Sequence, residues 1–292
     1  LKVINDIEHS PEHKFMYIDE LQSDRVSVMS GIDEEKELFC KVSSEISGNY
    51  LIVNSNGVPN YKPSVGNNIE IKGSWKDELS SSKDGNPNMI GEWNWQFKIP
   101  LIDVTINPVN SDMDDLNNVS ETSLSAIGVA SNGVPLFNPW HNNEDEYTSE
   151  SRDATTFATF DSCCGHPAPP ESGESGEGPY HYHKYPTCVA GNMGISNDRT
   201  LLKEHDIADV LDDRLNLNGI KGHSPLLGYM LDGYPIYGPL GTTSNILDDD
   251  TEIKILKSSY KFDTAKRSYN YVKGEGDLDK CNAIYSATPE YP

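Results

Sequence analysis

The sequence predicts a mainly β protein, namely a β-sandwich or barrel-like single domain with long loops and one or two short helices. Two observations predict this class. Short segments of alternating or β-branched residues recur along the chain, and turn-forming residues separate them, with 23 glycines and 18 prolines among 292 residues. The hydrophobic fraction of 36% fits a folded, loop-rich chain better than a disordered one.

The expected strands lie after residue 37. Apolar and polar residues alternate in them, or β-branched residues follow one another. They are residues 51–53, 69–72, 93–99 and 253–255. We expect residues 38–292 to form one domain that is incomplete at its C-terminus. The acidic, weakly patterned residues 1–37 are expected to form an N-terminal arm or linker.

A short repeat predicts hairpin turns. Ser55-Asn56-Gly57-Val58-Pro59 recurs as Ser131-Asn132-Gly133-Val134-Pro135, and Asp232-Gly233-Tyr234-Pro235 is similar to both. Asn-Gly and Asp-Gly favour the positive φ angles of a type I′ turn, and the proline that follows suits an edge or the start of a strand. We therefore expect three hairpins.

Helix is scarce in this sequence. The segment most typical of a helix spans residues 197–215, where apolar residues form an uneven stripe after Asn197, a residue suited to a helix N-cap. We expect this segment to be an insertion packed on the surface.

The charge balance excludes two classes of partner. The formal net charge is −23 at pH 7, which argues against nucleic acid as a partner, because a surface that neutralises phosphates needs clustered Lys and Arg. The same charge disfavours anionic membranes, and no apolar run approaches the roughly 18 residues that span a bilayer. The chain begins at Leu1 rather than Met, which we interpret as a processed start whose targeting segment has been removed. We expect a secreted, periplasmic or cell-surface protein.

The cysteines predict disulfides. Adjacent cysteines rarely bridge each other, so Cys163 and Cys164 should each pair elsewhere. Two pairings remain open: 163–188 with 164–281, or 163–281 with 164–188. A thiolate metal site is the alternative, although paired C-x-x-C spacing is missing. Cys40 is left as an unpaired or intermolecular cysteine, its partner lying in another chain or in sequence absent here.

The candidate functional residues are histidines. Alternate residues of a strand share a face, so Tyr180-His181-Tyr182-His183 should point both imidazoles one way and both phenols the other. His166 and His223 each lie on a glycine-bounded loop. We expect these four histidines to converge on a metal ion, because imidazole suits copper and zinc at neutral pH.

Other groups would orient the metal ligands. Each imidazole needs an outer hydrogen-bond partner to fix its tautomer. The sequence offers as candidates Asp161, Asp232, Tyr180 and Tyr182. The alternative interpretation gives the histidines a structural role, bonded to backbone in a tight β core.

Several motifs together resemble one known family. The motifs are Cys163-Cys164-Gly165-His166-Pro167, Gly178-Pro179-Tyr180-His181-Tyr182-His183, Gly222-His223-Ser224-Pro225-Leu226-Leu227-Gly228-Tyr229, Asp232-Gly233-Tyr234-Pro235-Ile236-Tyr237-Gly238-Pro239 and Leu278-Asp279-Lys280-Cys281-Asn282. This ordered set resembles the YHYH domain family, whose members are mostly secreted. The resemblance runs from about Cys40 to the end of the chain, and it implies an extracellular or periplasmic location but no particular activity.

This chain departs from the family pattern in two places. The link at residues 171–178 is longer and more acidic than is usual before the YHYH motif, and the chain stops at Pro292 where relatives continue into another aromatic strand. That strand is a candidate source of a partner for Cys40.

Other chemistry receives less support. Asn110, Asp112, Asp114 and Glu121 follow the spacing of an EF-hand loop, but Asp115 stands where the EF-hand requires glycine. Calcium at the acidic loops 212–213 or 248–250 is a weaker expectation. Neighbouring residues of an extended segment face apart, so Ser224 and His223 make a poor nucleophile and base.

Three hypotheses of function follow. The first is a secreted module that binds copper or zinc through its histidines. The second is a self-assembling structural subunit of an extracellular filament, surface layer or matrix. The third, an enzyme that uses the metal for oxidation or hydrolysis, ranks last because the sequence offers no substrate pocket, and we assign no catalytic residues.

Overall fold

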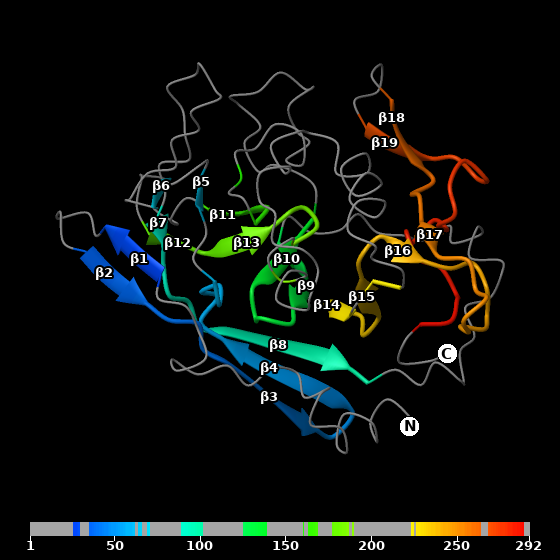
Figure 1. Ribbon diagram of the computed structural model, residues 1–292. Coiled ribbons are helices and arrows are strands. Elements are labelled where there is room, and N and C mark those ends of the chain that lie inside the picture. The colour runs from blue at the N-terminus through cyan, green and yellow to red at the C-terminus, as the bar shows by residue number, and fades with distance from the viewer. Residues whose placement is uncertain are drawn as a thin grey trace.

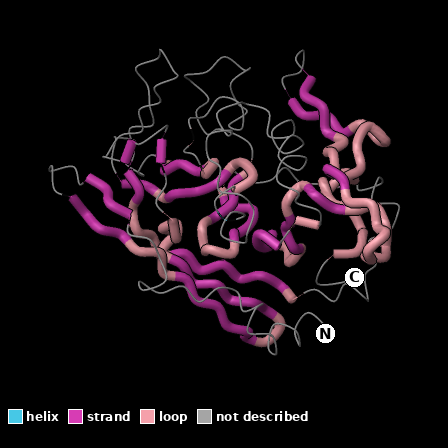
Figure 2. The backbone as a smooth tube through the Cα atoms, in the orientation of Figure 1, coloured by secondary structure: helices cyan, strands magenta, loops and turns pink. Residues whose placement is uncertain are grey.

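A computed structural model shows the architecture of the protein (Figure 1). It describes residues 26–29, 35–61, 64–65, 69–70, 89–101, 125–138, 160, 163–168, 177–186, 189, 223–224, 226–263 and 268–288. The elements of these residues are strands that form several sheets, none of them closed into a barrel (Figure 2). The mainly β class is thereby confirmed, and the barrel-like variant is not. The expected helix at 197–215 lies outside the described residues.

Two of the expected segments, residues 51–53 and 93–99, lie in a three-stranded antiparallel sheet, whose third strand, β3, was not predicted. It comprises β3 (Val42–Ser47), β4 (Tyr50–Ser55) and β8 (Trp95–Pro100), in the order β3-β4-β8. Leu51 lies opposite Ile99, and Val53 lies opposite Phe97. All four of these side chains are buried, because alternation places them on one face of the sheet.

A six-stranded sheet forms the centre of the molecule. Its order is β11-β13-β10-β9-β14-β15, and every pair is antiparallel except β10 with β13. The strands are β9 (Ala126–Ala130), β10 (Pro135–Phe137), β11 (Gly165–Pro167), β13 (Tyr180–Tyr182), β14 (Leu226–Met230) and β15 (Pro235–Tyr237). The YHYH segment therefore lies inside this sheet, between β11 and β10.

Short strand pairs complete the described structure. They are β1 (Val26–Met29) with β2 (Glu35–Leu38), β5 (Ser64–Val65) with β6 (Ile69–Glu70), β7 (Met89–Ile90) with β12 (Glu177–Gly178), β16 (Leu240–Gly241) with β17 (Lys254–Ile255), and β18 (Tyr260–Asp263) with β19 (Ser268–Tyr271). β12, which comes just before β13 in the chain, pairs in parallel with β7 and so connects this region to the N-terminal half of the chain.

Two of the three expected hairpins form. Residues 131–134 join β9 to β10, and residues 231–234 join β14 to β15. The turn type differs from type I′, which needs positive φ at two consecutive residues. In each of these loops only the glycine has positive φ, 80° at Gly133 and 100° at Gly233. Gly133 N donates to Ala130 O, and Gly233 N donates to Met230 O, so each is a type I turn followed by a left-handed glycine.

The first copy of the repeat plays another role. Gly57 has φ of 71°, but β4 does not continue into a hairpin partner there. Asn56 instead links three segments: its side chain accepts from Lys41 N and donates to Phe39 O, and its carbonyl accepts from Trp93 N.

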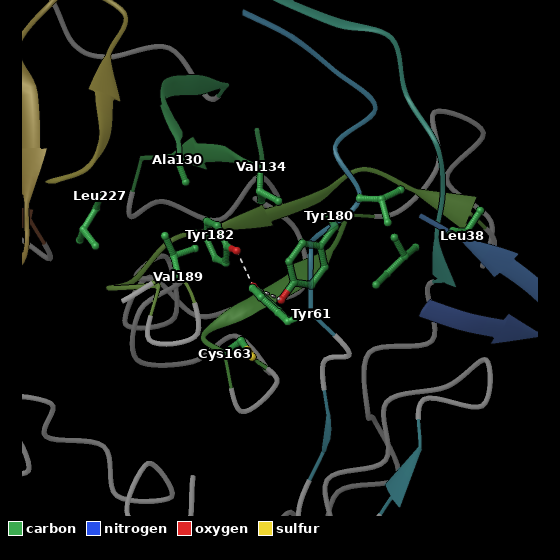
Figure 3. Packing of buried hydrophobic residues seen from close by; sticks show 11 residues of the cluster. Leu38, Tyr61, Ala130, Val134, Cys163, Tyr180, Tyr182, Val189 and Leu227 are labelled. Carbon is green, nitrogen blue, oxygen red and sulfur yellow. Dashed lines mark hydrogen bonds between the residues drawn. The ribbon is translucent and has the colours of Figure 1, made fainter. Parts of the chain in front are cut away.

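Two hydrophobic clusters join the sheets. One unites the three-stranded sheet with Val129 of β9, and so packs the two sheets together. The other surrounds Tyr180 and Tyr182 and includes Leu38, Tyr61 and Leu227 (Figure 3). Each cluster combines residues of the N-terminal strands with residues of the six-stranded sheet. The expected domain limits remain a prediction.

The cysteines differ from both expected pairings. Cys163 is disulfide-bonded, and Cys188 lies outside the described residues. Cys281 carries an exposed free thiol, whereas each expected pairing gave it a partner. It lies in a polar turn where its N–H donates to the Asp279 carboxylate. The expected bridge to Cys281 is therefore wrong.

Cys40 is an internal residue. Its side chain is 0% exposed, and its thiol donates to Asn132 O over 3.5 Å. Burial raises the pKa of this thiol to about 12. The intermolecular interpretation of Cys40 finds no support in this position, because a bridge to another chain requires the sulfur to reach the surface.

Candidate metal centre

Three of the four expected histidines converge at one edge of the six-stranded sheet. His166 in β11 lies directly opposite His181 in β13, and His183 follows two residues later on the same face. Each histidine contributes one ring nitrogen to a group whose members all lie within 4.8 Å of one another. The shared face of His181 and His183 was predicted from strand alternation, and the antiparallel register adds His166.

The nitrogens that face one another are the Nε2 atoms. His181 Nε2 lies 3.1 Å from His166 Nε2 and 3.0 Å from His183 Nε2. His166 and His181 are buried and His183 is half-buried. His181 thus stands at the centre of a group of three imidazoles.

Backbone carbonyls fix the tautomers of two of these rings. His181 Nδ1 lies 3.0 Å from Pro179 O, and His183 Nδ1 bonds to Asn138 O. A carbonyl oxygen only accepts, so both Nδ1 atoms carry the hydrogen, and each neutral ring keeps a lone pair at Nε2. The two lone pairs face each other and repel unless a cation, either a proton or a metal ion, lies between them. This arrangement is the one in which histidine binds metal, with Nδ1 oriented by backbone and Nε2 free to coordinate.

Aromatic side chains enclose the rings. Phe137 stacks on His181 with ring centroids 4.2 Å apart, and Phe160 stacks on His166 at 4.7 Å. His183 meets both phenylalanines edge-on. Lys184 places its ammonium 4.9 Å from the centroid of Phe160. The imidazole planes are therefore held by packing as well as by hydrogen bonds.

The tyrosines of the motif lie on the opposite face of the strand from the histidines. Tyr180 and Tyr182 are fully buried, and Tyr61 binds both phenolic oxygens, that of Tyr180 at 3.3 Å (Figure 3). Asn132 Nδ2 donates to the Tyr182 oxygen over 3.1 Å. Their expected place as outer partners of the ligands is wrong, because strand alternation turns them into the core.

The aspartates expected to orient the rings are placed differently. Asp232 is exposed in the β14–β15 turn, where its carboxylate accepts from Tyr234 N over 3.3 Å. Asp161 lies outside the described residues. The orienting groups that the structure shows are the carbonyls of Pro179 and Asn138.

His223 does not join the group formed by the other three histidines. Its Nδ1 lies 2.7 Å from Ser224 O, and its ring meets Tyr237 edge-on with centroids 5.1 Å apart. The neighbouring Ser224 donates its N–H to Leu240 O, which attaches this segment to β16. The prediction that His223 is a fourth ligand is therefore wrong. His223 packs beside β15, at the opposite end of the sheet from β11.

The acidic loops give no cation site among the residues described. The loops at 110–121 and 212–213 lie outside them. In the loop at 248–250, Asp248 Oδ1 accepts from Asp250 N and from the Thr251 hydroxyl, so this carboxylate stabilises a turn. Within the part of the chain that the structure describes, no helix is both long and apolar enough to cross a membrane.

Comparison with known proteins agrees with the sequence motifs. A search of curated proteins and a search of solved structures found no match. A family model described as YHYH protein matches residues 102–292, well over half of the chain. The match begins later than the resemblance read from the motifs, so β3, β4 and β8 precede it. Because it spans the three-histidine cluster and most of the chain, the protein belongs to the YHYH protein family.

Proposed function

We propose that this protein binds a transition metal ion, copper or zinc, through His166, His181 and His183. The observation that carries the proposal is the convergence of three Nε2 atoms, with the lone pairs of His181 and His183 directed at each other. Imidazole nitrogen is the ligand type that zinc and copper share, whereas calcium and magnesium prefer oxygen.

The proposal includes an extracellular or periplasmic location. The disulfide at Cys163 suits an oxidising compartment, and the chain belongs to a family whose resemblance implied secretion. The high negative charge would raise the local concentration of cations near the surface. We therefore propose a secreted or periplasmic metal-binding protein.

The test is a metal titration with matched variants. The purified protein is stripped with a chelator and titrated with Cu(II) or Zn(II), with binding followed by calorimetry and the bound metal by elemental analysis. Wild type should bind one ion per chain. The double variant His181→Ala/His183→Ala should lose at least about 100-fold in affinity, since even outer-shell changes cost 10–100-fold.

The control is His223→Ala, because His223 lies apart from the cluster. This variant should bind metal as wild type does. A wild-type protein that binds neither copper nor zinc would contradict the proposal, as would a double variant that binds as tightly as wild type. A double variant that fails to fold while the stripped wild type stays folded would give the histidines a structural role.

The hypothesis of a structural subunit remains a separate prediction. It expects the protein to assemble with rising concentration or with calcium, which sedimentation would reveal. A protein that stays monomeric under both conditions would contradict it.

A further inference from the structure

The three imidazoles approach a shared point from one side. A ring that binds through Nε2 places its centroid about 3.2 Å from the metal ion, so rings on opposite sides of an ion have centroids about 6.4 Å apart. The observed separations are 4.6 Å for His166 and His181, 4.8 Å for His181 and His183, and 5.4 Å for His166 and His183. No two of these three rings therefore lie across the ion from each other.

The rings form a pyramid with the metal ion at its apex. Their separations correspond to angles of about 90–115° at the ion, and the three angles together fall short of a full circle by about 55°. The ion therefore lies to one side of the three nitrogens, and its far side is a fourth coordination position. Zinc in proteins is almost always four-coordinate, and a site with three protein ligands holds water or substrate in the fourth position. Cu(II) with nitrogen ligands likewise takes at least four.

The charge of the site determines which ligand the fourth position favours. Histidine binds metal as neutral imidazole, and the Nδ1 atoms of His181 and His183 are held in that form by the carbonyls of Pro179 and Asn138. A divalent ion keeps both of its positive charges in such a ligand set. His166 and His181 are buried, so water solvates these charges poorly. An anion in the fourth position offsets them.

Lys184 adds a further positive charge beside the cluster. Its ammonium lies 4.9 Å from the centroid of Phe160. The Phe160 ring in turn stacks on His166 at 4.7 Å and meets His183 edge-on at 6.1 Å. Because His183 is half-buried, solvent reaches the cluster at this ring. A small anion that enters from solvent therefore meets two positive charges, that of the ion and that of Lys184.

We infer that the bound metal ion keeps one exchangeable coordination position, opposite the three imidazoles, which takes a small anion such as hydroxide, a halide or a carboxylate, and that the charge of Lys184 strengthens this binding. The inference rests on the proposed function, because the metal must be bound first. A site closed by four protein ligands serves to hold a fold together, whereas a site with an exchangeable position can capture or activate a small molecule. The protein then has a ligand of its own beyond the metal.

The primary experiment is an azide titration of the full chain loaded with Cu(II), or with Co(II) as the coloured substitute for zinc if the site takes only zinc. Loose metal is first removed by gel filtration. An azide-dependent change in the visible absorption spectrum should saturate at one azide per metal ion, with the metal still on the protein by elemental analysis. A loaded protein whose spectrum does not change, or that loses its metal to azide, would overturn the inference while metal binding stands. Failure to bind copper or zinc at all would instead contradict the proposed function.

The second experiment tests whether charge selects the ligand. Acetate and acetamide have nearly the same size and shape, but only acetate carries a charge. Acetate should compete with azide and reverse the spectral change. Acetamide should compete at least about 10-fold less well, because it does not offset the charge of the ion. Equal competition by the two compounds would show that the position is open but does not select anions, and that part of the inference would be wrong.

The third experiment compares two lysines that each lie over an aromatic ring. Lys184→Gln should still bind metal but should bind azide about 2- to 5-fold more weakly, as expected for the loss of one nearby charge. The matched control is Lys98→Gln, because Lys98 lies 4.0 Å from the centroid of Tyr50 in the three-stranded sheet. This variant should bind azide as wild type does. An unchanged azide affinity in Lys184→Gln, or an equal loss in both variants, would show that the assigned role of Lys184 is wrong.

Discussion

The two faces of β13 make opposite use of the same alternating segment. On one face Tyr180 and Tyr182 are fully buried and their hydroxyls bond to Tyr61 (Figure 3). On the other face His181 and His183 present nitrogen lone pairs to each other. The hydroxyls of the first face bond to one another, whereas the Nε2 atoms of the second face meet at a point where a cation is favourable. The comparison teaches that buried polar side chains indicate a ligand site when their lone pairs face each other, and not when they bond to one another.

The tyrosine face should dominate stability. Tyr182→Ala removes a fully buried ring and should lower the free energy of unfolding by about 3–5 kcal/mol, as other aromatic-to-alanine changes in cores do. The change should be measured by denaturant unfolding of metal-free protein. His181→Ala in the same metal-free state should cost much less. A His181→Ala cost as large as that of Tyr182→Ala would erase the difference between the two faces.

Gly165 couples the two faces. A Cβ at this position would lie 2.3 Å from the Tyr180 hydroxyl oxygen, so Gly165→Ala must displace either the phenol or β11. Overpacking of this kind should cost about 1–3 kcal/mol in the free energy of unfolding. Because Gly165 precedes His166, the displacement should also weaken metal binding, measured by calorimetry. Unchanged stability and unchanged metal affinity together would show that the register of β11 is not held by this contact.

Alkaline pH should destabilise the two hydrophobic cores. The pKa of Cys40 is raised by burial from 9.0 to about 12, and burial likewise raises the pKa of Tyr185 to about 12. The folded state therefore keeps a proton that the unfolded chain loses, so stability is complete below pH 9 and falls as pH rises toward 12. The loss of unfolding free energy that comes from Cys40 approaches about 1.4 kcal/mol per pH unit in this range.

The variant Cys40→Ala isolates the pH-dependent loss of stability that comes from the Cys40 thiol. Unfolding free energies of the variant and of wild type, measured by denaturant at several pH values above 9, should converge as pH rises, because the variant lacks the buried thiol. Parallel pH profiles for the two proteins would mean that the thiol does not ionise differently in the folded and unfolded states.

Cys281 should matter least. Its thiol is free and exposed, so Cys281→Ser should change the free energy of unfolding by no more than about 0.5 kcal/mol. The native protein should also react at this position with a thiol reagent, as shown by mass spectrometry of the labelled peptides. A large loss of stability, or a Cys281 peptide recovered in a disulfide, would restore the pairing that the structure corrects.

Local periodicity explains which parts were predictable from sequence. The common face of His181 and His183 and the burial of β4 and β8 follow from a two-residue period alone. The contribution of His166 follows less directly, since it depends on an antiparallel register that spans fifteen residues. The mainly β class was predictable because the strands and turns alternate at short range.

Long-range contacts explain what the sequence did not reveal. His223 resembles a ligand in its glycine-rich setting, but its neighbour Ser224 pairs with β16 and keeps it beside Tyr237. The orienting groups are backbone carbonyls, which carry no residue signature. Phe137 and Phe160 reach the histidines from separate segments, and no spacing in the sequence marks them as partners.

The most direct test of the central claim is to locate a bound metal by anomalous X-ray scattering. Crystals of the chain loaded with Cu(II) or Zn(II) would be measured at the absorption edge of the metal. We predict one strong peak about 2.0–2.1 Å from the Nε2 atoms of His166, His181 and His183. Loaded crystals with no peak among these three nitrogens, or with the metal bound elsewhere, would contradict the account.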